Sequence, residues 1–147
     1  MRTTRKSGFT LVELMIVAAI IAILAAILIP LLSSNKDSAI ASEAANICGS
    51  VATEMKTYYA RTGTWPTKTQ LAAGIIDEEV NKARYFNWGE VFITATDNWA
   101  VRVTGDGAGG SSSSQGFSDG VNTLTLSETG SGPVYGGSIV TKGWVAN

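Results

Sequence analysis

Histidine is absent from this chain of 147 residues, and cysteine occurs once, at Cys48. The commonest general base and metal ligand is therefore missing, and no disulfide can form within one chain. The residues are 16% charged and 45% hydrophobic, which excludes a disordered polyampholyte. The sequence has no Walker loop, no zinc-ligand cluster and no nucleophile elbow, so we expect a protein that is not an enzyme and has no firm metal site.

One stretch, from Leu14 to Ile29, carries no polar side chain at all. It lies inside an apolar segment, residues 9–32, and about 20 helical residues at ~1.5 Å each cross a hydrocarbon core of ~30 Å. The sequence therefore predicts a transmembrane helix. Glu13 places a carboxylate near the start of this segment, and because a charge in a membrane is costly, we expect it to have a partner.

Three interpretations compete for residues 1–32. A secretory signal peptide has a basic start, but its apolar region spans 7–15 residues and ends in a small-x-small site, unlike this one. A single-span anchor with a cytoplasmic N-terminus satisfies the positive-inside rule, yet it leaves Glu13 and the junction between Gly8 and Phe9 unexplained. The third is a prepilin, because Lys6-Ser7-Gly8-Phe9-Thr10-Leu11-Val12-Glu13 closely resembles the cleavage signature of type IV pilins and type II secretion pseudopilins.

The resemblance implies that residues 1–8 are a leader, which a membrane prepilin peptidase removes after Gly8, and that Phe9 is then N-methylated. Glycine offers a protease an unhindered backbone. In a filament, Glu13 of one subunit is expected to pair with the Phe9 amine of its neighbour, because a buried carboxylate needs such a partner. In pilins, a proline in the position of Pro30 marks a stretch that can melt during assembly; in any helix it removes one hydrogen bond.

The same resemblance implies a homo-oligomeric filament, an inner-membrane assembly platform and the lipid bilayer as partners. The subunit would cross the bacterial inner membrane once, with a cytoplasmic N-terminus, and then enter an extracellular pilus, or a periplasmic pseudopilus. Without the leader, eight basic residues remain against twelve acidic ones, a net charge of −4. This acidic body argues against direct binding of nucleic acid.

Three functions stay open. The favoured one is a structural subunit of a type IV pilus, which would serve adhesion, motility or DNA uptake. The second is a type II secretion pseudopilin that drives protein export, but the Asp-Pro-Trp-Gly segment of major pseudopilins is missing, since no proline lies between Pro66 and Pro133. Many major pilins close their C-terminal region with a disulfide, which Cys48 alone cannot form. The third is a monomeric, membrane-anchored binding module.

The sequence after residue 32 predicts an α+β fold, in which the long helix packs on a small antiparallel sheet, as in the ladle-shaped pilins. Residues 33–62 should continue the helix as an amphipathic half and end at Thr62-Gly63. The apolar positions recur every three or four residues, at Ile40, Ala44, Ile47, Val51, Met55 and Tyr58. Cys48 lies beside this stripe and should be a small buried apolar side chain.

Residues 63–147 should form a globular head. Thr67 and Gln70 form a capping-box pattern that predicts a short helix ending at Gly74, and residues 77–82 could add another helical turn. Alternating apolar residues predict strands at 90–95, 99–104, 121–126 and 137–144, with a hairpin turn at residues 97–98. Sequential strands joined by short turns favour an antiparallel meander.

Residues 105–120 are rich in glycine and serine, which predicts a flexible surface loop. One alternative is a Ca²⁺ site that uses Asp106, Asp119 and backbone carbonyls, although the EF-hand spacing is absent. Another is O-linked glycan on the serines. Apart from this calcium alternative, the sequence predicts no cofactor.

Overall fold

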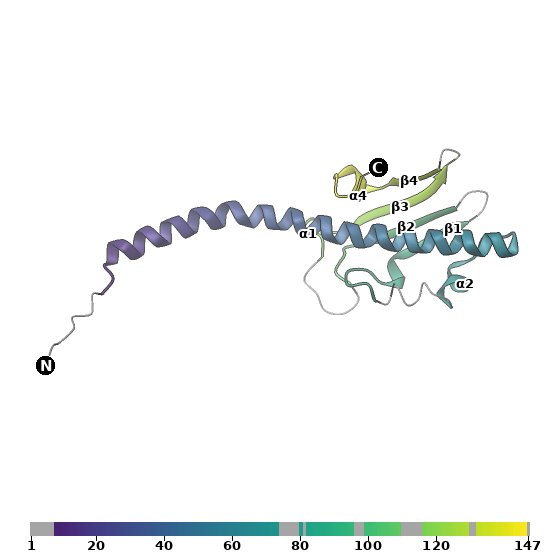
Figure 1. Ribbon diagram of the computed structural model, residues 1–147, viewed down its shortest axis with the longest axis horizontal. Coiled ribbons are helices and arrows are strands. Elements are labelled where there is room, and N and C mark those ends of the chain that lie inside the picture. Colours follow the sequence, from purple (N-terminus) through teal and green to yellow (C-terminus); the bar gives the residue numbers. More distant parts are fainter. Residues whose placement is uncertain are drawn as a thin grey trace. The chain divides into compact units, whose positions relative to one another are not determined.

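The computed structural model describes residues 8–73, 80, 82–95, 99–109, 116–129 and 132–146. It divides into two compact units, residues 1–35 and residues 36–147, and each is described by itself. Helix α1, Leu11–Thr62, contributes to both units (Figure 1). It ends as predicted, because Gly63 adopts a φ of 72° and its N–H donates to the Tyr59 carbonyl at 2.8 Å.

The second unit holds a four-stranded antiparallel sheet in the order β1-β2-β3-β4. The strands are β1 (Val91–Ala95), β2 (Trp99–Gly105), β3 (Asn122–Thr129) and β4 (Gly132–Gly136). The described residues of this unit also form three short helical elements: α2 (Lys68–Ala72), η1 (Trp88–Glu90) and α4 (Ser138–Thr141). The fold is therefore α+β, with a long N-terminal helix on an antiparallel sheet, and the first three predicted strands are confirmed (Figure 1).

The hydrophobic core of the second unit lies between α1 and the sheet. The predicted stripe of α1 is buried from Ile40 to Met55, whereas Tyr58 is half-buried. From the sheet, the inward-facing residues Val101, Val103 and Leu124 have no exposed surface. No buried residue of this core precedes Ile40, so the described residues of the first unit contribute nothing to it.

The predicted strand at 137–144 is wrong. The fourth strand lies earlier, at Gly132–Gly136, and residues 138–141 form α4. Gly137 separates the two with φ 101° and ψ −179°, a conformation that turns the chain out of the sheet. Pro133 is tolerated in β4 because this is an edge strand of the sheet formed by the described residues, and an edge strand does not need every N–H group for pairing.

A polar cluster holds the C-terminal region to β3. Asn122 is 1% exposed, and its amide group donates to Asp119 Oδ1 at 2.8 Å. Its carbonyl oxygen accepts from Ser138 Oγ at 3.0 Å and from Lys142 Nζ at 2.6 Å. Lys142 also forms an ion pair with Asp119, and these hydrogen bonds from Lys142 and Asn122 lower the pKa of the Asp119 carboxyl. Every polar atom of the buried Asn122 side chain thus has a partner.

Two carboxylates of α1 form long-range ties that the sequence pattern does not reveal. Asp37 is 2% exposed and accepts hydrogen bonds from the N–H of Ser118, at 2.9 Å, and from the Ser118 hydroxyl. Glu43 accepts from the N–H groups of Arg84, at 3.0 Å, and Tyr85, at 2.6 Å. Each carboxylate therefore fastens a loop of the head to the helix.

At α2, the Gln70 side chain accepts from the Thr67 N–H at 2.8 Å, which is the Gln70 half of the predicted capping box. Gly74 and the hairpin turn at residues 97–98 lie outside the described residues, as does most of the predicted helical turn at 77–82.

Candidate functional site

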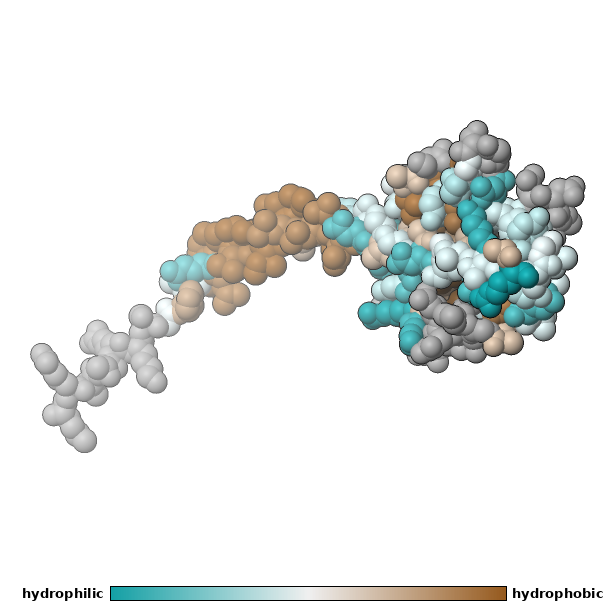
Figure 2. Space-filling model, turned by 45° about the vertical axis from the view of Figure 1, so that its right-hand side comes forward, coloured by the Kyte–Doolittle hydropathy of each residue, from teal (hydrophilic) through white to brown (hydrophobic). Residues whose placement is uncertain are grey.

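The apolar segment of α1 is the first candidate. Sixteen large apolar side chains between Phe9 and Leu32 are each more than half exposed. Figure 2 shows them as a continuous apolar surface along this part of the helix. Among the described residues, α1 is also the one helix long and apolar enough to cross a membrane. A surface of this size is not stable in water, so it must lie in lipid or against other apolar helices.

The start of α1 is built around Thr10 and Glu13. The Glu13 carboxylate accepts hydrogen bonds from the Thr10 N–H at 2.8 Å and from the Thr10 hydroxyl at 2.7 Å. In return, the Glu13 N–H donates to the Thr10 hydroxyl at 3.3 Å. Thr10 is thus the N-cap and Glu13 the third helical residue of a capping box, a pattern of Thr-x-x-Glu that the sequence displays and that our prediction overlooked.

Gly8 and Phe9 precede the helix in a non-helical stretch. Phe9 is 85% exposed, and a Cβ atom added to Gly8 would meet no atom within 4 Å. The peptide bond between them is therefore accessible in the subunit. In the given chain the Phe9 nitrogen belongs to this peptide bond, and only hydrolysis of the bond would turn it into an ammonium able to pair with a carboxylate.

Pro30 lies inside α1, where it has no N–H to donate along the helix. One turn on, the Ser33 hydroxyl donates to the Ile29 carbonyl at 3.4 Å. Both features are typical of helices that bend. The helix is nevertheless continuous through this region.

The two candidate calcium ligands have different partners. Asp119 pairs with Lys142, whereas Asp106 Oδ1 accepts from the N–H of Ala108 at 2.8 Å. Within the described ranges, no three histidine, cysteine, aspartate or glutamate side chains are grouped as they would be around a metal ion. Residues 110–115 of this loop lie outside those ranges, so the calcium alternative stays a prediction.

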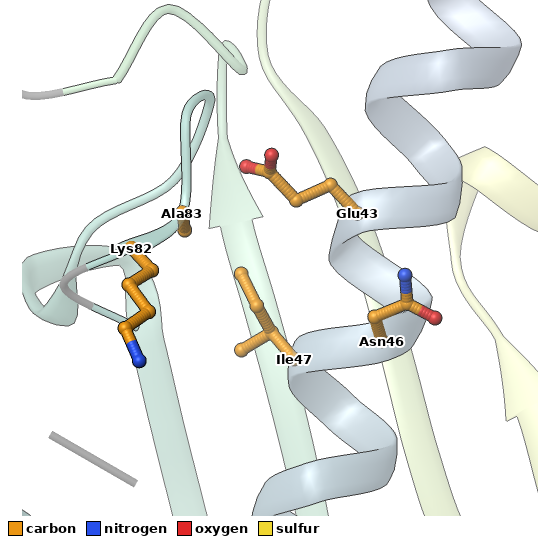
Figure 3. A pocket seen from close by; sticks show the side chains of 5 residues that line it. All are labelled: Glu43, Asn46, Ile47, Lys82 and Ala83. Atoms are coloured by element: carbon orange, nitrogen blue, oxygen red, sulfur yellow. The ribbon is translucent and has the colours of Figure 1, made fainter. Parts of the chain in front are cut away.

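A cavity of about 270 Å³ lies beside α1 in the second unit (Figure 3). Its lining residues are Glu43, Asn46, Ile47, Lys82 and Ala83. Glu43 and Ile47 reach from the helix toward the segment that carries Lys82 and Ala83. Because the Glu43 carboxylate is held by two backbone N–H groups, its role here is structural.

Cys48 is buried, as predicted, and its thiol lies 3.9 Å from the Val101 carbonyl. Burial raises the pKa of this thiol to about 12. Since the thiolate is the nucleophilic form, the Cys48 side chain is inert at neutral pH.

The comparison with protein families decides what the N-terminal segment is. Residues 3–29 match the model of the prokaryotic N-terminal methylation motif. The chain carries this methylation motif. The matched motif includes Gly8, Phe9, Thr10 and Glu13, and therefore both the accessible peptide bond and the capping box.

The chain is similar to proteins named as type IV major pilins and fimbrial proteins, and to a core protein of a type II secretion system. It is 37% identical to the type IV major pilin protein PilE of Neisseria gonorrhoeae over 98 residues, 65% of this chain and 58% of the relative. It is 46% identical to the fimbrial protein EcpC of Eikenella corrodens over 70 residues, 48% and 45% of the two chains. Type II secretion system core protein G of Pseudomonas aeruginosa is 28% identical over 90 residues, which are 61% of this chain and 63% of that relative.

The chain therefore spans about half the length of the first pilins it matches. No solved structure matches it.

Proposed function

We propose that this chain is a prepilin that is cleaved after Gly8 and assembled, through its apolar N-terminal helix, into a type IV pilus. The observation that carries the proposal is the continuous exposed apolar surface between Phe9 and Leu32, which begins at the methylation motif. The core of the second unit begins at Ile40 and includes none of these side chains. Lipid before assembly and copies of the same helix afterwards would each cover it.

The role is structural rather than catalytic, in keeping with relatives that are named as pilins and fimbrial proteins. Before assembly the apolar helix would anchor the subunit in the inner membrane, with Arg2, Arg5 and Lys6 on the cytoplasmic side. A prepilin peptidase would act there, and an assembly platform would extract the mature subunit into the filament.

The second candidate function is that of a type II secretion pseudopilin. It is favoured by the similarity to core protein G, which covers 63% of that relative, at a lower identity than the pilins show. Electron microscopy of material sheared from the cell surface separates the two. Extracellular filaments that contain this subunit support the pilus, whereas filaments confined to the periplasm support the pseudopilus. A subunit found only as a membrane-bound monomer would contradict both.

We expect the mature subunit to begin at Phe9 and to carry one methyl group on its N-terminal nitrogen. The reason is the accessible, unhindered bond after Gly8. The intact mass of the subunit from filaments, with N-terminal sequencing, measures this directly. A Gly8→Val variant should keep the full leader, while Ser7→Ala should be processed normally. Mature protein that retains Met1, or that begins after Ser33, would contradict the prepilin interpretation.

We expect a fragment that begins at Lys36 to be a soluble, folded monomer. This boundary retains Asp37 with its tie to Ser118 and removes only residues that are absent from the core. The measurements are analytical ultracentrifugation and circular dichroism, with the detergent-solubilised full chain as the control. A fragment that polymerises would show that residues 1–35 are not needed for assembly. A fragment that lacks cooperative unfolding would show that residues 36–147 do not fold by themselves.

A further inference from the structure

The outward face of the sheet differs in character from the rest of the head. Because successive strand residues point to opposite faces, the residues next to the buried Val91, Val101 and Val103 along their strands point away from the core. The described residues on this outward face are Phe92, Thr94, Ala100, Arg102, Thr104, Thr123, Thr125, Ser127 and Val134. They include one aromatic ring, one cation, no carboxylate, and the hydroxyls of Thr94, Thr125 and Ser127. The Thr104 hydroxyl oxygen is buried, and the Thr123 hydroxyl accepts from the Ser138 N–H at 3.3 Å.

Phe92 is the centre of this face. It is 45% exposed on the edge strand β1, and Arg102 is its register partner on β2. The Arg102 guanidinium carbon lies 5.2 Å from the centre of the Phe92 ring. Lys68, the first residue of α2, places its ammonium 5.8 Å from the same ring. The ring thus gathers two cations from separate elements, at cation–π distance.

Neither cation has a carboxylate partner among the described residues. The Lys68 ammonium donates to the Trp88 carbonyl and lies 5.7 Å from the Trp88 ring. Partial burial lowers the pKa of Lys68, as expected for a cation that loses water without gaining a counter-ion. Glu90, which directly precedes β1, instead accepts from the Asn87 N–H and lies against Gly105.

The local charge is opposite to that of the whole second unit. From Lys36 to Asn147, eight basic residues stand against eleven acidic ones. The outward face, with two cations, an exposed aromatic ring and hydroxyls, therefore differs in charge from the rest of this unit's surface. It offers charge-assisted hydrogen bonds, an apolar contact and neutral hydrogen bonds within one flat area.

We propose that this face, centred on Phe92, Lys68 and Arg102, binds an acidic polysaccharide. The carboxylate of a uronic acid would be bound by the two cations, and the apolar side of a sugar ring would pack on Phe92. The neighbouring hydroxyls of Thr94 and Thr125 would pair with hydroxyls of the sugar. This function goes beyond assembly, since it belongs to the surface of each subunit.

The charge of the head favours a sparsely charged polymer over nucleic acid. A nucleic acid carries one phosphate per nucleotide, and its binding draws on many cations, whereas this face has two. The net negative head repels such a dense charge at long range. A glycan with one carboxylate per disaccharide meets less repulsion and makes fuller use of the hydroxyls.

The test is binding of a hyaluronan oligosaccharide to the full chain in non-ionic detergent, measured by microscale thermophoresis at two salt concentrations. We expect salt-sensitive binding that Arg102→Gln and Lys68→Gln each weaken about three- to fivefold, the range of an exposed charge interaction. Arg102→Lys keeps the charge but loses the planar group that stacks on Phe92, so its affinity should lie between those of wild type and Arg102→Gln. Lys36→Gln removes one charge from α1, away from this sheet face, and serves as the matched control.

Neutral dextran should not bind, and an oligonucleotide of equal length should bind more weakly than hyaluronan. Absence of hyaluronan binding, tighter binding of the oligonucleotide, or an equal loss in Lys36→Gln would each overturn the proposal. The three substituted side chains, of Lys36, Lys68 and Arg102, are exposed or half-buried, so circular dichroism of all four variants should match wild type. Because the assay uses unassembled subunits, its outcome is independent of whether the chain forms a pilus.

Discussion

Glu13→Leu should abolish filaments and leave the amount of subunit in the membrane unchanged. Leucine makes the apolar segment more apolar, so the hydrophobic effect alone predicts equal or better assembly. In a filament core, however, the ammonium of a mature Phe9 would lose its anionic partner, and a buried charge without a partner is strongly unfavourable. We therefore expect the filament yield to fall by more than about tenfold.

The capping box complicates this experiment, because Glu13 also bonds to Thr10 within its own subunit. Two further variants separate the roles. Glu13→Gln keeps a side chain that can complete the box but removes the charge, and we expect it to be nearly as poor as Glu13→Leu. Thr10→Val removes the capping hydroxyl and keeps the charge, and should assemble close to the wild-type level.

The measurement is the ratio of subunit in sheared filaments to subunit in the membrane fraction. If Glu13→Gln assembles normally while Thr10→Val does not, the carboxylate serves the helix start and not the docking of subunits. Wild-type filament yield from Glu13→Leu would show that assembly does not need the carboxylate. If the carboxylate docks subunits as predicted, it must give up its hydrogen bonds to Thr10 during assembly and pair with a neighbour's amine instead.

Gly137→Ala should destabilise the head by at least about 3 kcal/mol. Its φ of 101° and ψ of −179° lie in a region that only glycine occupies at low cost, and forcing another residue there costs about 1–3 kcal/mol. In addition, a Cβ atom at this position would come within 2.5 Å of the Thr123 carbonyl oxygen. The backbone of β3 or of α4 would have to move, which would disturb the cluster around Asn122.

The adjacent Gly136 is the matched control. A Cβ atom there would meet nothing within 4 Å, and its φ is not positive, so Gly136→Ala should change the free energy of unfolding by less than about 1 kcal/mol. The measurement is denaturant unfolding of the full chain in non-ionic detergent, followed by near-ultraviolet circular dichroism. Equal stability of the two variants would show that the turn after β4 adapts to a side chain.

The sequence predicted the elements whose signal is local. The stripe from Ile40 to Met55 repeats at helical spacing over several turns, and the alternation in β1, β2 and β3 has no breaker within it. The segment at the methylation motif was recognisable because glycine, phenylalanine, glutamate and the apolar run lie in register.

The parts that were missed depend on contacts between distant residues. No residue near Asp37 in the sequence predicts its hydrogen bond with Ser118. Likewise, no residue near Glu43 predicts its hydrogen bonds with the N–H groups of Arg84 and Tyr85. The last strand was misplaced because its position is decided by pairing with β3, at Gly132–Gly136, and not by the local pattern of residues 137–144. The cation–aromatic cluster at Phe92 is likewise assembled from α2 and two strands.

The polar cluster around Asn122 has a consequence for how the head matures. It closes the C-terminal region with hydrogen bonds and one ion pair, where a covalent sulfur bridge would need a second cysteine. Such contacts form as fast as the chain folds and require neither a thiol oxidase nor an oxidising compartment. The finished head is consequently indifferent to reductants, and its closure can open and reform without any chemical step.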